Sequence, residues 1–163
     1  LHDELRRQRQ MCIRDSLSSD HAGIELRQAV ATHLVDGGYK TVDLGPQDGE
    51  SVDYPDYGAR LAEAMQDDPA SRGIAICGSG IGISIAANRF EWVRAALVNE
   101  VTAARLCREH NDANVLALGQ RLTGIAVALD CVDTFMATPF QGGRHERRVN
   151  KLGQLRGINN QEQ

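Results

Sequence analysis

Residues 75–84 have the sequence AICGSGIGIS, and this segment decides how the rest of the chain is interpreted. An apolar run at 73–76 predicts a strand that ends at a single cysteine, Cys77. Three glycines at alternate positions follow, and a short apolar helix begins among them. Glycine lets the backbone approach a ligand closely, and N–H groups at a helix N-terminus attract negative charge and stabilise a thiolate. The segment therefore predicts a base or nucleophile beside an anion-binding loop, where open α/β sheets bind ligands.

Two other interpretations of this segment have to be weighed. A free cysteine is often a small apolar core residue, so Cys77 taken alone fits simple packing. The glycines also resemble a dinucleotide-binding loop, with Glu100 in the place of the acid that binds ribose. However, the third glycine comes one position too early, and the helix that follows is short, ending near residue 88. Nucleotide binding is therefore disfavoured.

Composition excludes several classes of protein. The 163 residues suit one domain with a real core. A net charge of −4 argues against general nucleic-acid binding, and an aromatic content of 4% argues against a base-stacking surface. The four cysteines and five histidines lack the spacing of a metal or redox site. No secretory or membrane-spanning segment is recognisable, so we expect a cytoplasmic protein.

Apolar runs alternate with helical patterns along the chain. This order is typical of α/β proteins with a parallel sheet. Strands are expected at 39–44, 73–76, 93–98 and 114–118, and helices at 24–35, 57–65, 102–110 and 123–137, with helical periodicity resuming at 142–153.

The beginning of the chain does not fit this pattern. Residues 17–23 look like the end of a first strand turning into a helix, yet residues 1–16 are polar and highly charged. Buried central strands are nearly continuously apolar, and here only Ile13 and Leu17 qualify. We therefore predict that the original first strand is lost or replaced upstream of Leu17. Residues 1–16 would be a disordered or artefactual head, 17–156 the domain, and 157–163 a polar tail.

Asp20 and His21 occupy a second strand-to-helix junction. Parallel strands would bring them to the same edge of the sheet as Cys77, although Asp20 also suits a plain helix N-cap. His110 and Asn111 end a helix just before a strand. Here His110 suits a partner of the helix dipole, and Asn111 is an ordinary turn former.

Basic residues gather near the end of an otherwise acidic chain. Arg144 and Arg148 are four residues apart, so on a helix they would share one face and suit a phosphate group. Arg121 follows a strand and a turn and is a candidate to join them. Solvated surface arginines are the alternative for all three.

Five motifs in this order resemble ribose-5-phosphate isomerase type B, over about residues 17–152. They are Ser19-Asp20-His21-Ala22-Gly23, Asp53-Tyr54-Pro55, the segment from Cys77 to Asn88, the segment from Arg108 to Ala117, and Gly142-Gly143-Arg144-His145. The resemblance implies a three-layer α/β/α Rossmann-like sandwich with a mostly parallel sheet and a C-terminal helix. It also implies a homodimer or a dimer of dimers whose active sites are shared between subunits.

The same resemblance implies interconversion of ribose 5-phosphate and ribulose 5-phosphate through an enediolate, without metal or cofactor. Cys77 would be the carbon base, His110 would assist ring opening, and Ser79, where the family often has threonine, would move a proton between oxygens. Backbone N–H groups of Gly78, Ser79, Gly80, Ile81 and Gly82 would stabilise the enediolate. Asp20 and Asn111 would orient sugar hydroxyls, and the phosphate would be held by His21, Arg121, Arg144 and Arg148.

Two alternatives remain open at this point. Relatives of this kind also isomerise allose 6-phosphate or galactose 6-phosphate, and shared motifs do not separate these substrates. A phosphosugar-binding module without catalysis is the other alternative, and the altered first strand keeps it open. The intact Cys77, Ser79 and His110 favour an enzyme.

Overall fold

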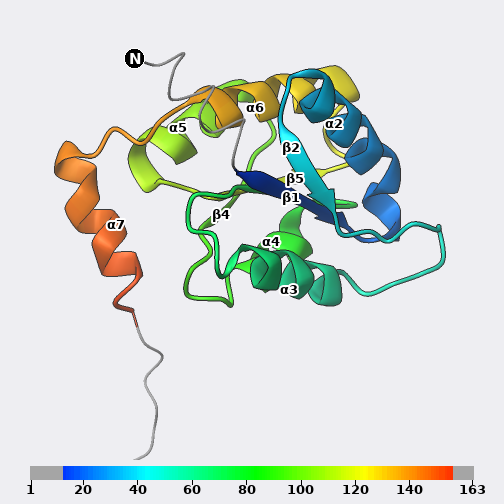
Figure 1. The fold of residues 1–163 in the computed structure, drawn as a ribbon, viewed down its shortest axis with the longest axis horizontal. Helices are drawn as coiled ribbons and strands as arrows, with labels where there is room; N and C mark the ends of the chain where they lie inside the picture. Colours follow the sequence, from blue (N-terminus) through cyan, green and yellow to red (C-terminus); the bar gives the residue numbers. More distant parts are fainter. Residues whose placement is uncertain (1–12, 156–163) are drawn as a thin grey trace, which may run out of the picture.

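Five parallel strands form one sheet in the computed structural model, which describes residues 13–155 (Figure 1). The strand order is β2-β1-β3-β5-β4, and each neighbouring pair is parallel. The strands are β1 (Arg14–Ser19), β2 (Lys40–Asp43), β3 (Gly73–Cys77), β4 (Ala95–Leu97) and β5 (Val115–Gly119). This sheet confirms the predicted α/β class.

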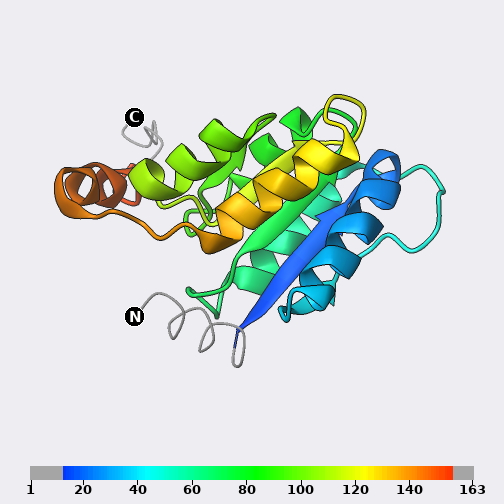
Figure 2. The same cartoon turned by 90° about the horizontal axis from the view of Figure 1, so that it is seen from above.

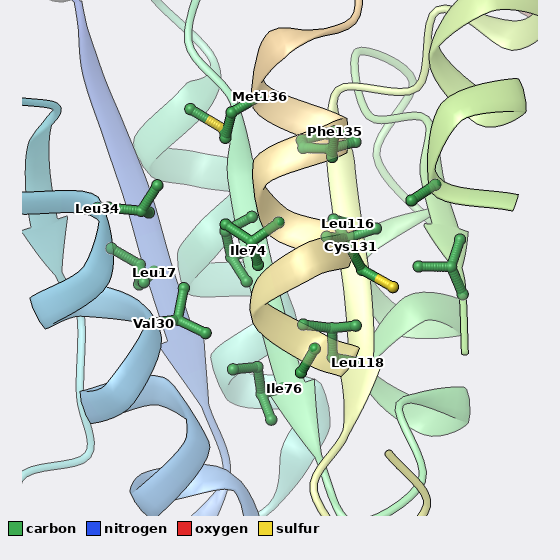
Figure 3. Close-up of a cluster of buried hydrophobic side chains, with 14 of the residues drawn as sticks. Leu17, Val30, Leu34, Ile74, Ile76, Leu116, Leu118, Cys131, Phe135 and Met136 are labelled. Atoms are coloured by element: carbon green, nitrogen blue, oxygen red, sulfur yellow. The ribbon is translucent and has the colours of Figure 1, made fainter. Parts of the chain in front are cut away.

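Helices cover both faces of the sheet, which gives three layers (Figure 1), and Figure 2 looks down onto one of these faces. One face carries α2 (Ile24–Asp36), α5 (Val101–Asn111) and α6 (Ile125–Ala137), and the other carries α3 (Tyr54–Met65) and α4 (Ile81–Ala87). Side chains alternate across a strand, so Ile74 and Ile76 of β3 enter the first core while Ala75 and Cys77 enter the second. Figure 3 shows the first core between α2 and α6.

The predicted boundaries of most elements agree with the structure to within two residues. The start of α3 differs, because the helix begins at Tyr54 with Pro55 in its first turn rather than at residue 57. Proline suits that position because its missing N–H has no helical partner there. The helical segment predicted at 142–153 divides into a 3-10 turn, η2 (Gly143–His145), and α7 (Glu146–Leu152).

The prediction that the first strand is lost is wrong. β1 begins at Arg14 and lies in the sheet between β2 and β3, so residues 14–16 belong to the fold and not to a head. From Asp15 to Ser19 every residue is buried, although four of the five are polar. Residues 1–12 and the predicted tail at 157–163 lie outside the described part of the chain.

Hydrogen bonds explain how such a polar strand is buried. The Asp15 carboxylate accepts a bond of 2.9 Å from the Arg72 backbone N–H. The Ser18 hydroxyl donates to the Tyr57 carbonyl at 2.8 Å, and the Ser19 hydroxyl accepts from the Arg27 guanidinium at 2.6 Å. A buried polar group is costly only when it lacks a partner. Partners distant in sequence therefore replace the apolar side chains of an ordinary central strand.

The chain reverses its direction of winding between β1 and β3. β1 leads through α2 to β2 on one side, and β2 leads through α3, on the opposite face, to β3 on the other side. Ligands of open α/β sheets bind outside the carboxyl ends of the strands at such a switch point. Residues that follow β1 and β3 are therefore at the expected binding position.

Helix α7 extends away from the body of the protein (Figure 1). None of its residues is buried, and Leu152 is 48% exposed. No helix in residues 13–155 is long and apolar enough to cross a membrane.

Candidate active site

The ends of β1, β3 and β5 meet at the carboxyl edge of the sheet. The Asp20 N–H, just after β1, donates to the Ile76 carbonyl of β3 at 3.1 Å. Cys77 is opposite Gly119 in the register of β3 with β5, and the Gln120 N–H donates to the Cys77 carbonyl at 3.0 Å. The structure thus brings Asp20 and Cys77 to one edge, as predicted from the parallel strands.

The Cys77 thiol is held inside the glycine loop. The side chain is 4% exposed, and its sulfur accepts a hydrogen bond of 3.1 Å from the Gly80 N–H. The Ser79 hydroxyl accepts from the Ile81 N–H at 3.2 Å. Both contacts are donated by backbone N–H groups, which favour negative charge on the accepting atom. The loop therefore presents backbone N–H donors to both the Cys77 sulfur and the Ser79 hydroxyl.

Close packing explains two glycines around this loop. Gly80 has φ +78°, and a Cβ there would lie 2.6 Å from Cδ1 of Leu97. A Cβ on Gly119 would lie 2.5 Å from the backbone of Ser79. Since real Cβ atoms do not approach that closely, only glycine lets the end of β5 support the loop from below. The loop is thus fixed by the sheet before any ligand binds.

Arg121 lies against the loop. A Cβ added to Gly78 would be 3.4 Å from Nη1 of Arg121, and the Arg121 N–H donates to the Gly78 carbonyl at 3.0 Å. Its guanidinium therefore places a positive charge beside Cys77.

Asp20 and His21 lie in the turn after β1. One carboxylate oxygen of Asp20 accepts from the Ala22 N–H at 2.9 Å, so Asp20 is an N-cap, as one of its two interpretations predicts. A carboxylate has a second oxygen for a ligand. The Nδ1 atom of His21 is 3.1 Å from the N atom and 3.2 Å from the O atom of Val52, in the loop between β2 and α3. That loop therefore fixes the imidazole.

A second group of candidate residues surrounds the last turn of α5. The rings of His110 and His145 are stacked, with centroids 4.3 Å apart and planes 14° apart. They line a cavity of about 300 Å³ together with Asn111, Arg148 and two apolar residues of α7. Sequence reasoning assigned no role to His145, although it stands within the basic run. It is 6% exposed and is a central member of this cluster.

Arg144 and Arg148 converge on His145 without sharing a helix. Arg144 lies in η2 and Arg148 in α7, so the predicted common helical face is not the reason for their proximity. The pKa of His145 is lowered, mainly by burial. The neighbouring His110 and the two arginines are smaller causes of the same shift. The fixed positive charges of this cluster are the guanidinium groups of Arg144 and Arg148.

The two groups lie at opposite edges of the sheet. α5 ends just before β5, and the Gly73 N–H at the start of β3 donates to the Asn114 carbonyl. Cys77 and Gly119 are at the other ends of the same two strands. With a rise of about 3.3 Å per residue, five-residue strands separate these edges by about 13 Å. One chain therefore does not assemble all the predicted residues into one site.

Neighbouring polar residues have structural roles. Asp112 ends α5 with φ +46° and pairs with Arg94 and Arg108.

Cys107 and Cys131 are buried in the first core, and burial raises the pKa of Cys107 to about 11. Among residues 13–155, no three His, Cys, Asp or Glu side chains converge to hold a metal ion.

Tyr54 is a further residue without a role assigned from the sequence. A Cβ on Gly82 would lie 2.7 Å from the ring of Tyr54, so this ring covers the first turn of α4. Tyr54 is 44% exposed, and its ring lies against Gly82 of the glycine loop. The Asp53-Tyr54-Pro55 motif was the available signal.

Known proteins share this fold and much of this sequence. Ribose-5-phosphate isomerase B of Escherichia coli (strain K12) is 42% identical over 133 residues, covering 82% of this chain and 89% of that protein. The solved structure of ribose-5-phosphate isomerase B from Clostridium thermocellum is 50% identical with a TM-score of 0.84, covering 86% of this chain and 95% of that one. The Mycoplasma genitalium enzyme, solved with bound ribulose-5-phosphate, is 37% identical with a TM-score of 0.85, covering 88% and 96%.

These likenesses confirm the resemblance inferred from the five motifs. The model of one protein family matches residues 16–152, from within β1 to the end of α7. The match therefore includes the candidate residues at both edges of the sheet. The chain belongs to the Ribose/Galactose Isomerase family.

Proposed function

We propose that this chain is an aldose–ketose isomerase that interconverts ribose 5-phosphate and ribulose 5-phosphate. The observation that carries the proposal is the Cys77 thiol, held against the backbone N–H groups of the glycine loop at the switch point of the sheet. The E. coli relative is named for this reaction, and the Mycoplasma genitalium relative was solved with bound ribulose-5-phosphate. We place the protein in the cytoplasm, where the thiol stays reduced.

The reaction moves one proton between two carbons of the open-chain sugar. The Cys77 thiolate takes the proton from C2 of the aldose, and the electron pair of that C–H bond forms the C1–C2 double bond of an enediolate. The negative charge moves to the oxygen on C1. Backbone N–H groups of the loop from Gly78 to Gly82 stabilise it, and such preorganised donors are often the largest single contribution to rate.

Two further proton movements complete the conversion. The Ser79 hydroxyl passes a proton from the oxygen on C2 to the oxygen on C1, so that the new carbonyl forms at C2. The Cys77 thiol then returns its proton to C1, which gives the ketose and regenerates the thiolate. All these groups belong to the polypeptide, so the proposed reaction uses no metal and no cofactor.

A second copy of the chain completes the site. Within one chain, the second group of candidate residues lies too far from Cys77 for both to contact the same small sugar. This group comprises His110, Asn111, Arg144 and Arg148. Helix α7 buries none of its residues, and a groove of about 990 Å³ opens beside it between α5 and β4. In a symmetric dimer each copy would supply its α5 and α7 residues to the glycine loop of the other.

In this arrangement the sugar is held at both ends. His110 of one copy assists opening of the furanose ring, and Asp20 and Asn111 orient the hydroxyl groups. His21, Arg121, Arg144 and Arg148 hold the phosphate. Binding energy gained at the phosphate then fixes the orientation of C1 and C2 over Cys77.

Replacing either Arg144 or Arg148 by methionine is expected to weaken substrate binding and inhibition by inorganic phosphate in parallel. A charge-assisted hydrogen bond contributes about 1.5–3 kcal/mol, so each constant should rise about tenfold or more. Arg147 is the matched control, because it lines a separate surface hollow with Glu146 and Lys151. Phosphate inhibition constants that are equal in the three variants would show that this cluster is an ordinary solvated surface.

The substrate assignment is tested by a coupled assay on ribose 5-phosphate, allose 6-phosphate and galactose 6-phosphate in parallel. We expect the highest kcat/KM for ribose 5-phosphate. Preference for a six-carbon sugar would transfer the assignment to that substrate, and binding without turnover of any of them would identify a phosphosugar-binding module.

A further inference from the structure

Arg27 carries a charge at a position where the helix needs only apolar packing. It lies on α2 among the buried residues Leu26, Val30 and Leu34, and its own exposure is 0%. Burying a charge is strongly unfavourable unless it is paired and hydrogen-bonded. The charge of Arg27 is therefore retained through polar partners, which an aliphatic side chain would leave without their donor.

The guanidinium group joins three segments at the carboxyl edge of the sheet. Its Nη1 donates to the Ser19 hydroxyl at 2.6 Å, at the end of β1. Its Nε is 3.0 Å from Oδ1 of Asp43, at the end of β2, as an ion pair without hydrogen-bond geometry. Its Nη2 donates to the Pro46 carbonyl, in the loop that follows. Arginine suits this position because its planar fork reaches several acceptors at once.

These contacts form a closed network beneath Asp20 and His21. The Ser19 N–H donates to the Gly45 carbonyl at 3.2 Å, and the Gly45 N–H donates to the Asp43 carboxylate at 2.9 Å. Ser19 directly precedes Asp20 in the chain. The loop that starts at Gly45 continues to Val52, whose backbone contacts Nδ1 of His21. Arg27 thus anchors the strand end before Asp20 and the loop that holds His21.

We infer that Arg27 is a positioning residue for Asp20 and His21, an inference that rests on the proposed function because those two residues bind the substrate there. It acts by fixing the end of β1 against the loop from Asp43 to Val52. When the Val52 N–H donates to Nδ1 of His21, the ring proton stays on Nε2, which is then a donor for a phosphate oxygen. Loss of the network frees the loop and, with it, the orientation of the imidazole.

The test measures KM and kcat for ribose 5-phosphate in Arg27→Met and Arg27→Lys. We expect Arg27→Met to raise KM about tenfold or more, as loss of supporting contacts around a site commonly does, with a smaller change in kcat. Arg27→Lys keeps an ammonium that reaches Asp43, so it should recover most of the wild-type KM.

Arg72→Met is the matched control. Arg72 also donates to two backbone carbonyls, of Phe135 and Met136, but it lies next to the amino end of β3. Its replacement should lower the melting temperature and leave KM unchanged. If Arg27→Met does not fold, Ser19→Ala and Asp43→Asn carry the same test, because each removes one contact of the network with little change in volume.

Hydrogen exchange of the Val52 amide supplies a readout that needs no enzyme activity. Faster exchange in the folded Arg27, Ser19 and Asp43 variants, but not in Arg72→Met, supports the inference. Unchanged exchange and unchanged KM in these variants overturn it and leave Arg27 as a structural residue. A wild-type protein that turns over no sugar phosphate refutes the proposed function instead, and Val52 exchange still decides whether Arg27 holds the loop.

Discussion

Replacing Cys77 by alanine is expected to lower kcat for ribose 5-phosphate by about 10²–10⁴-fold, the contribution of a positioned acid–base group. The side chain is small and the loop is held mainly by backbone contacts and by Gly119, so the fold should survive. Exchange of the C2 proton with solvent should be lost to the same extent, because the thiolate is the group that removes this proton. The measurements are steady-state turnover and proton exchange followed by NMR in deuterated water.

Cys131→Ala provides the control for this experiment. Cys131 is also a buried free thiol, but it lies in the core between α6 and the sheet, where burial raises its pKa. This variant should lose some stability and keep its kcat. Near-wild-type turnover of Cys77→Ala would mean that Cys77 is only a packing residue and that another group is the base.

Mixing two inactive variants is expected to restore activity when their lesions lie at opposite edges of the sheet. In a dimer with shared sites, Cys77→Ala and His110→Asn damage different halves of each site. A mixed dimer then contains one intact site and one doubly damaged site. With random exchange of subunits, half of the dimers are mixed, so about a quarter of the wild-type turnover should return.

A pair of lesions at the same edge is the matched control for the mixing experiment. Cys77→Ala mixed with Asp20→Asn leaves every site damaged in any combination, so no activity should return. Subunit exchange is checked independently with differently tagged copies. Exchange without recovery in the first pair would contradict the shared site and would require His110 to act away from Cys77.

The glycine loop was the most predictable part of the site. An apolar strand, a terminal cysteine and alternating glycines determine local geometry almost without help from the rest of the chain. The position of Asp20 followed from the rule that parallel strands end at the same edge. The same rule places His110 and Asn111 at the other edge, because they end the helix that precedes β5.

Features that depend on distant partners were not predictable. The polar sequence of β1 argues against a central strand, because the partners of Asp15, Ser18 and Ser19 are 57, 39 and 8 residues away in sequence. The role of Arg27 likewise depends on partners that are not adjacent to it in sequence. A weak signal exists, since Val30 and Leu34 follow it at the helical spacings of one face. A charge on that face marks a buried contact whose partners only the structure identifies.

The exposed position of α7 has a consequence for the size of the sugar. In the proposed dimer, Cys77 acts on the first two carbons of the substrate, while Arg144 and Arg148 bind the phosphate at its far end. His21 and Arg121 bind the same phosphate from the chain that carries Cys77, so the reach of η2 and α7 across to the other copy contributes to the length of sugar that fits. Since α7 buries none of its residues within its own chain, its reach can change over evolution without disturbing the core. In the proposed dimer, a longer sugar would then be accommodated by changes at the dimer contact, while the chemistry at Cys77 stays the same.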